Sequence, residues 1–86
     1  MGRKSRKKIE HLPEKLLQIR LTLGLSQSQM KERLQLESTY HAVSRYEIGE
    51  HEPSLITLLR YAQLAGVSTD ILIDDTKDLP KKFQKS

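Results

Sequence analysis

Cysteine and tryptophan are both missing from this chain of 86 residues. Without cysteine the chain can form no disulfide and offers no thiolate as a nucleophile or zinc ligand. It also has no run of about 18 apolar residues, so no segment is expected to span a membrane. The first residues carry charge instead of the apolar stretch of a secretory signal. We therefore expect a small soluble intracellular protein with one domain.

Positive charge gathers at the two ends of the chain. The total is 15 Lys and Arg against 11 Asp and Glu, a net charge of +4. Residues 1–8 hold five of these cations, among them Arg3, Lys4 and Arg6, whereas acidic residues outnumber basic ones by 10 to 6 between residues 9 and 76. This distribution predicts a basic flexible arm over residues 1–9, a helical domain over 10–75 and a basic tail over 76–86. The ends suit contacts with phosphates, and solvated tails that aid solubility are the alternative.

Apolar residues recur at helical spacing early in the chain. The residues of this pattern are Leu12, Leu16, Ile19 and Leu23. They predict a helix that carries Pro13 in its first turn and ends at Gly24. A second helix is expected from about Gln27 to Leu34, because Ser26 and Gln29 have the spacing of a capping box.

Three more short helices are expected after residue 38. The third runs from about Thr39, with Ser38 or Thr39 as its cap, to Ile48, and Val43 and Tyr46 face inward. The fourth begins after Pro53 and Ser54 and ends at Gly66, and a short fifth helix follows Ser68. The residues expected to form the buried stripe of the fourth helix are Leu55, Leu58, Leu59, Ala62 and Ala65. No segment alternates with a period of two, so the fold class is all-α, a compact bundle of five short helices.

The second and third helices have the layout of a helix-turn-helix, two short helices joined by a tight turn. The outer face of the third carries short polar and basic side chains that suit base edges in a major groove about 12 Å wide. These residues are Tyr40, His41, Ser44 and Arg45. For Arg45, the alternative is a surface ion pair with Glu37 or Glu52.

Several short motifs in order resemble the Cro/repressor-type (xenobiotic response element) helix-turn-helix family. The motifs are Ile19-Arg20, Gly24-Leu25-Ser26-Gln27, the run from Val43 to Gly49, Pro53-Ser54-Leu55 and Gly66-Val67-Ser68. The resemblance implies a lambda-repressor-like DNA-binding domain and covers roughly Leu12 to Asp74. The chain departs from the family pattern at Lys31, where alanine is usual, and in the distance from Ser26 to Glu47, which is about two residues longer.

The resemblance also implies roles for individual residues. Gln27 would contact a phosphate at the start of the second helix, where free N–H groups and the helix dipole attract anions. Ser38, Thr39, Tyr40 and His41 would begin the DNA-reading helix, and Ser44 and Arg45 would lie on its next turn. Arg20 and Glu47 would form a structural ion pair between the first and third helices.

These observations favour a transcriptional regulator, a repressor of bacterial or phage type, that binds double-stranded DNA. Two copies are expected on a pseudo-palindromic operator, by self-association or cooperative binding, and the candidates for a dimer contact are the fifth helix and the tail through Phe83. An antitoxin or adaptor that binds another protein is the alternative, which the acidic centre favours, and RNA binding is a third. No metal, cofactor, small-molecule ligand or catalytic site is expected, since the three histidines lie on different elements. The expected location is the cytoplasm, in association with the nucleoid.

Overall fold

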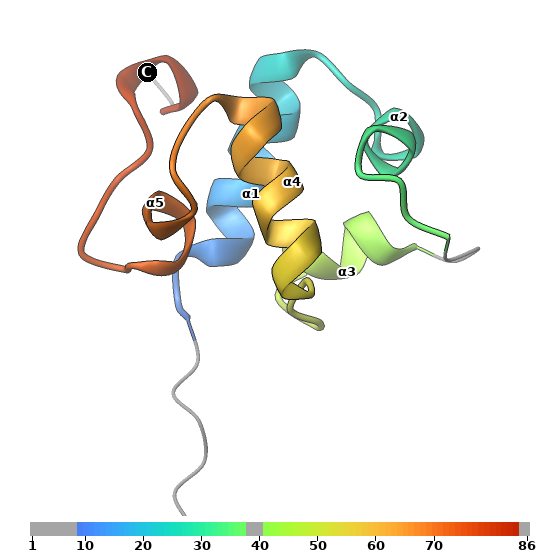
Figure 1. The fold of residues 1–86 in the computed structure, drawn as a ribbon, viewed down its shortest axis with the longest axis horizontal. Coiled ribbons are helices and arrows are strands. Elements are labelled where there is room, and N and C mark those ends of the chain that lie inside the picture. Colours follow the sequence, from blue (N-terminus) through green and yellow to red (C-terminus); the bar gives the residue numbers. More distant parts are fainter. Residues whose placement is uncertain (1–8, 38–40, 85–86) are drawn as a thin grey trace, which may run out of the picture.

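The computed structural model describes residues 9–37 and 41–84, which fold into helices around one core. The elements are α1 (Leu12–Leu23), α2 (Gln27–Arg33), α3 (Ala42–Ile48), α4 (Leu55–Ala65), α5 (Thr69–Ile73) and a 3-10 turn, η1 (Lys81–Phe83). Figure 1 shows α1 in the centre, with α2 and α3 on one side of it and α5 with the C-terminal segment on the other. Helix α1 packs against α3, α4, α5 and η1. The described residues contain no strand, and the predicted all-α bundle of five helices is confirmed.

Local sequence signals set most of the helix ends, as predicted. The Ser26 hydroxyl accepts a hydrogen bond from the Gln29 backbone N–H at 3.0 Å, and the Gln29 side chain accepts one from the Ser26 N–H at 2.8 Å. Ser54 likewise accepts a hydrogen bond from the backbone of α4. Helix α1 ends at Gly24, whose φ of 72° is readily adopted only by glycine.

The start of α3 differs from the prediction. The helix begins at Ala42 instead of Thr39, and His41 precedes it with a non-helical ψ of 55° and no capping hydrogen bond from its side chain. Helix α2 ends with Gln35 in the left-handed region, at φ 58°, and the Leu36 N–H donates to the Lys31 carbonyl at 3.2 Å. This ending turns the chain away from the α2 axis, and the residues expected to begin α3, Ser38, Thr39 and Tyr40, lie outside the described residues.

The core also differs from the sequence pattern, chiefly in α4. Tyr61 is fully buried there, whereas Leu55 and Leu59 are 82% and 43% exposed. The buried stripe of α4 follows residues 58, 61, 62 and 65, which share one helix face. Leu59 points about 100° away from Leu58, and Leu55 lies in the first turn, before this stripe begins. In α1, Leu23 is likewise partly exposed, at 37%.

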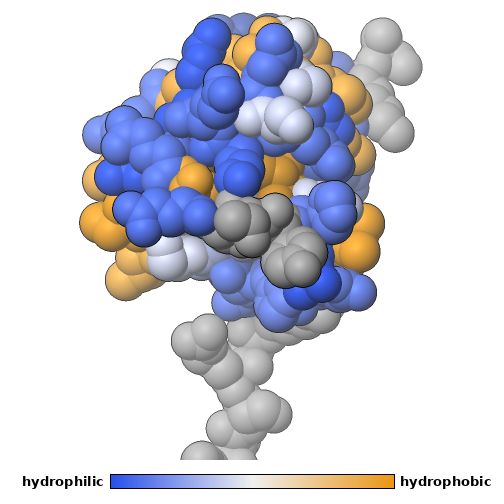
Figure 2. Space-filling view, turned by 90° about the vertical axis from the view of Figure 1, so that its right-hand side faces the viewer, coloured by the Kyte–Doolittle hydropathy of each residue, from blue (hydrophilic) through white to orange (hydrophobic). Residues whose placement is uncertain are grey.

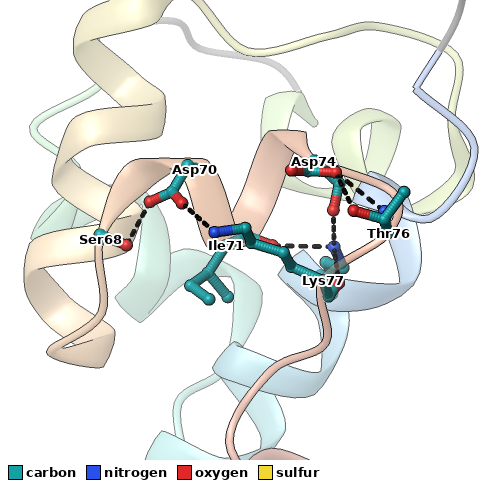
Figure 3. A network of polar contacts seen from close by, with 7 residues as sticks. Ser68, Asp70, Ile71, Asp74, Thr76 and Lys77 are labelled. Carbon is teal, nitrogen blue, oxygen red and sulfur yellow. Dashed lines mark hydrogen bonds and ion pairs between the residues drawn. The ribbon is translucent and has the colours of Figure 1, made fainter.

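A buried lysine joins α1 to α5 and to the chain that follows it. Lys15 is 6% exposed, and its ammonium group donates to the carbonyls of Ile71, Asp74 and Lys77 at 2.8, 3.2 and 2.7 Å. Next to this site, the carboxylate of Asp70 accepts hydrogen bonds from the Ser68 hydroxyl and the Lys77 ammonium group (Figure 3). Ser68 directly precedes α5 as its N-cap residue, which agrees with the sequence pattern, but its hydroxyl binds the Asp70 carboxylate and makes no capping bond to the backbone.

The C-terminal segment contributes to the core beyond residue 75, where the helical domain was expected to end. Leu79 and Phe83 are 5% and 2% exposed. The turn η1 packs against α1, and Figure 1 shows this segment beside α5. Because Phe83 is buried within its own chain, its side chain is not available as the dimer anchor that the sequence suggested.

Candidate nucleic-acid interface

The carboxylate of Glu47 holds α1, α2 and α3 together. Its two oxygens accept hydrogen bonds from Arg20 Nε at 2.7 Å and Arg20 Nη2 at 3.1 Å. The Gln27 amide donates to the same carboxylate at 3.1 Å, and Arg20 Nη1 donates to the Leu25 carbonyl at 2.9 Å. The pair between Arg20 and Glu47, which the family resemblance implied, is therefore present. It fixes the first residue of α2 relative to α3.

Burial makes this network stronger than a surface ion pair. The side chains of Arg20 and Glu47 are only 13% and 5% exposed. The hydrogen bond to Glu47 raises the pKa of Arg20 above its ordinary value, although burial acts in the opposite direction. A two-pronged contact between a guanidinium and a carboxylate is also geometrically specific. The network therefore sets how α2 and α3 are oriented.

The outward side of α3 presents Ser44, which is half-buried, and Arg45, which is exposed. Arg45 Nε lies 3.6 Å from the Glu50 carboxylate, and Arg45 Nη1 lies 3.4 Å from His51 Nε2. The side chains of Arg45 and Glu50 are 48% and 59% exposed, so the pair is open to solvent. Such exposed pairs contribute little free energy, about 0–1 kcal/mol. Arg45 can therefore exchange Glu50 for an anionic ligand at little cost.

A shallow groove of about 200 Å³ lies between α2 and α3. The residues that line it are Gln27, Ser28, Lys31, His41, Ala42, Val43 and Ser44. Figure 2 looks onto this side of the molecule, and hydrophilic side chains cover most of it. The groove thus joins the start of α2 to the start of α3 and offers amide, hydroxyl, ammonium and imidazole groups.

The structure brings only some of the predicted residues to this surface. Gln27, His41 and Ser44 line the groove, and Arg45 lies on the same short helix as Ser44. The other predicted DNA-binding residues, which lie outside the described residues, are Arg3, Lys4, Arg6, Ser38, Thr39 and Tyr40. His41 stands before the first turn of α3, whereas the sequence placed it within the helix.

Two groove residues, Ser28 and Lys31, were not among the predicted site residues. Lys31 was noted only as a departure from the family pattern, yet it is half-buried against the start of α3. Its position four residues after Gln27 puts both side chains on one face of α2. That spacing was a signal in the sequence from which Lys31 could have been added to the site.

The structure gives less support to a small-molecule pocket or a metal site as the main site of the protein. A second pocket, of about 260 Å³, lies between α1 and the C-terminal segment and includes His11, Gln18 and Phe83 in its lining. Across residues 9–37 and 41–84, no group of three His, Asp or Glu side chains is placed to hold a metal ion. Within the same ranges, no helix has the length and apolar character that crossing a bilayer requires.

Comparisons with known proteins agree with this geometry. A family profile described as "Helix-turn-helix" matches residues 16–72, which include α2, α3 and α4. The chain is 40% identical over 63 residues to the "SPbeta prophage-derived uncharacterized HTH-type transcriptional regulator YonR" of Bacillus subtilis (strain 168). The matched stretch is 73% of this chain and 56% of that relative, so the chain spans about half the length of the curated relative that it matches. No solved structure gives a significant match.

The family match covers the elements that carry the site. The Glu47 network, the capping box at Ser26 and the groove between α2 and α3 all lie within residues 16–72. Members of this family are transcriptional regulators and not enzymes. The family match therefore supports the expectation that this protein is not an enzyme. The chain belongs to the Cro/repressor-type helix-turn-helix family.

Proposed function

We propose that this protein is a transcriptional regulator that binds double-stranded DNA and recognises its sequence. Helix α3 would enter the major groove, and α2 would lie across the phosphate backbone. The observation that carries this proposal is the Glu47 network, because it ties the start of α2 to α3. When two helices are held together in this way, contacts to phosphates can set the position from which side chains read bases.

Individual side chains suit different parts of a DNA contact. The Gln27 amide has two N–H groups, of which one donates to Glu47, so the other could donate to a phosphate oxygen. Arg45 would contact a base, because the N–H donors of its guanidinium group match the O6 and N7 acceptors of guanine. Lys31 and His41 border the groove and would add contacts to the backbone.

The ends of the chain and a second copy complete the proposal. The basic arm with Arg3, Lys4 and Arg6 would follow the adjacent backbone or the minor groove. Because a seven-residue α3 reads only a few base pairs, two copies would bind a pseudo-palindromic operator, where the protein would act as a repressor. Such a protein would work in the cytoplasm, where it would associate with the nucleoid.

Selection of binding sites from a random pool of DNA duplexes, at about 150 mM salt, tests this function. We expect enrichment of a short inverted repeat. Arg45→Ala should weaken binding to the selected site by about 1–3 kcal/mol and relax the preference at one base pair. Deletion of residues 2–8 should weaken binding to all sequences alike and reduce the dependence of affinity on salt.

Lys82→Ala is the matched control for Arg45→Ala, because it also removes one exposed cation. Lys82 lies in η1, and Figure 1 shows the C-terminal segment at the opposite end of the molecule from α3. Its loss should leave the base preference unchanged and should weaken binding less than Arg45→Ala does. Equal losses for the two variants would mean that Arg45 contributes only general positive charge.

A protein-interaction module on the same fold is the second candidate. It is favoured by the excess of acidic residues, 10 to 6, between residues 9 and 76, since DNA-binding surfaces are usually basic. An antitoxin or adaptor would have a protein as its main partner. No enriched site, together with binding that fades steeply as salt rises, would make this the leading function.

A further inference from the structure

The pocket of about 260 Å³ between α1 and the C-terminal segment shares no lining residue with the groove between α2 and α3. One wall follows a single face of α1, from its N-cap residue onward, and consists of His11, Glu14, Lys15 and Gln18. The opposite wall consists of Asp78, Leu79, Phe83 and Gln84. We call this cavity the α1 pocket.

The α1 pocket combines a buried interior with a polar rim. The buried side chains are Lys15, Gln18, Leu79 and Phe83. The exposed side chains of the rim are His11, Glu14, Asp78 and Gln84. Ligand sites are commonly built in this way, because apolar walls supply contact area while a few polar groups fix the orientation of the ligand. The pocket therefore has the construction of a small-molecule site.

Gln18 offers an unused hydrogen-bond donor in the interior of the pocket. It is only 9% exposed, and its Nε2 has no hydrogen-bond partner among the described residues. Buried N–H groups are nearly always paired, so a partner from outside the chain is the natural explanation for one that is not. The Lys15 ammonium group, in contrast, already donates to three carbonyls, which is its full capacity. The interior therefore selects an acceptor oxygen, which Gln18 would bind.

The rim carries the opposite preference, because its charged groups are the carboxylates of Glu14 and Asp78. Neither carboxylate forms an ion pair within residues 9–37 and 41–84. These two carboxylates outnumber the single ammonium group in the lining, that of Lys15. The Lys82 ammonium group lies 5.2 Å from the centre of the Phe83 ring, but Lys82 does not line the pocket. The rim therefore favours a cation.

We propose that the α1 pocket binds a small aromatic amine that carries a hydrogen-bond acceptor at the end opposite its ammonium group. The acceptor oxygen binds Gln18 Nε2, and the ring packs against Leu79 and Phe83. The ammonium group lies at the rim, beside Glu14 and Asp78. The sequence pattern predicted no such ligand, because the pocket forms only where residues 78–84 fold back onto α1.

The size of the pocket limits the ligand and its affinity. A volume of about 260 Å³ lies just below the range of about 300–1,000 Å³ for typical ligand sites, so the ligand has on the order of ten non-hydrogen atoms. For a ligand this small we expect a dissociation constant on the order of 0.1–1 mM. Because the ligand touches both α1 and the C-terminal segment, its binding should also stabilise the fold.

Titration of isotope-labelled protein with tyramine, followed by NMR, tests the site. Tyramine has a phenol hydroxyl at one end and an ammonium group at the other, and it has about ten non-hydrogen atoms. The side-chain amide signals of Gln18 should shift and saturate, while the signals of Ser28 and Ser44 in the groove between α2 and α3 should not move. Unchanged Gln18 signals up to about 10 mM tyramine would overturn the proposal.

Two matched compounds test the two ends of the ligand. Phenethylamine lacks only the hydroxyl, so it should bind about tenfold more weakly than tyramine. Hydroxyphenylpropionate keeps the phenol but carries a carboxylate in place of the ammonium group, so the acidic rim should weaken its binding further. Equal affinity for the three compounds would mean unspecific apolar contact and would overturn the assignment.

Variants of the pocket test the residues. Gln18→Met keeps the volume but removes the amide, so tyramine should bind it about tenfold more weakly, no better than phenethylamine does. Glu14→Gln should weaken both amines about threefold and leave the ratio between them unchanged. Its control is Glu32→Gln, because Glu32 is also exposed but lies on α2, outside the pocket. A Gln18→Met variant that binds tyramine like the wild type would refute the role of Gln18.

DNA binding is independent of this inference. Figure 1 shows the C-terminal segment on the opposite side of α1 from α2 and α3. Tyramine should therefore leave the affinity for a selected duplex unchanged at equal ionic strength. A duplex that displaces tyramine would place the amine in the groove between α2 and α3, and this result would overturn the α1 pocket as its site.

Discussion

Removal of the Arg20 guanidinium should destabilise the fold far more than removal of a surface cation. In Arg20→Met, the Glu47 carboxylate would lose both of its contacts to Arg20 and, among the described residues, keep only the Gln27 amide. Because the Glu47 side chain is 5% exposed, water can replace little of this interaction. The variant therefore leaves a buried charge that is almost unpaired.

The expected cost follows from this burial. Breaking one side of a buried ion pair costs about 3–5 kcal/mol. The Arg20 side chain is 13% exposed, so some water reaches the site, and we take the lower end, about 3 kcal/mol. Domains of this size have a total stability of about 5–15 kcal/mol, so this one change removes a large share of it.

Urea unfolding followed by circular dichroism measures the loss. The midpoint should fall while the slope of free energy against urea stays constant, which shows that stability alone has changed. Arg45→Met is the control, because its pair with Glu50 is 3.6 Å long and exposed on both sides. The control should cost less than about 1 kcal/mol.

A double variant makes the reasoning refutable. Arg20→Met combined with Glu47→Leu removes both charges, so it should be more stable than Arg20→Met alone. Two results would refute the argument. One is an Arg20→Met variant no less stable than Arg45→Met, and the other is a double variant whose cost equals the sum of the single costs.

Three further changes test other parts of the packing, each by its urea midpoint. Lys15→Met should cost about 2–4 kcal/mol, because one carbonyl of α5 and two carbonyls after it lose a charged donor, and an unchanged midpoint would contradict this role. Tyr61→Phe should be neutral or stabilising, since the buried Tyr61 hydroxyl has no hydrogen-bond partner among the described residues, and a clear loss would show that the hydroxyl is bound. Asp75 accepts hydrogen bonds from the backbone N–H groups of Glu10 and His11, and these bonds lower the pKa of its carboxyl group. The ionised carboxylate therefore stabilises the fold fully above the unfolded pKa of about 3.9, and this contribution is lost as the pH falls through the folded pKa. The wild type should therefore be more stable than Asp75→Asn at pH 7, and this difference in stability should be smaller at about pH 3. An equal difference at both pH values would exclude a contribution from ionisation of Asp75.

The sequence was most informative where the responsible interactions are local. The capping box at Ser26 and Gln29 depends on two residues three positions apart, and it forms as the pattern predicts. The pair between Arg20 and Glu47 joins residues far apart in the chain, and it was accessible only through the family resemblance. Neither periodicity nor composition contains that information.

The start of α3 shows where local signals fail. Ser and Thr at positions 38 and 39 looked like caps, yet the helix begins at Ala42. The left-handed Gln35 at the end of α2 decides how the chain leaves that helix, and glutamine gives no sign of it in the sequence. Lys31 was similarly ambiguous, because only the position of α3 against α2 places it in the groove.

The sequence by itself determined that this protein is a bundle of short helices with a helix-turn-helix, because helical periodicity, caps and glycine ends act within a few residues. Only the tertiary structure decided which apolar residues are core. Phe83 is buried because η1 folds back onto α1, and Leu55 and Ile56 are exposed because the contact face of α4 lies elsewhere. Burial depends on which surfaces meet, and the hydropathy of a residue does not say whether its neighbour is its own chain, a second copy or water.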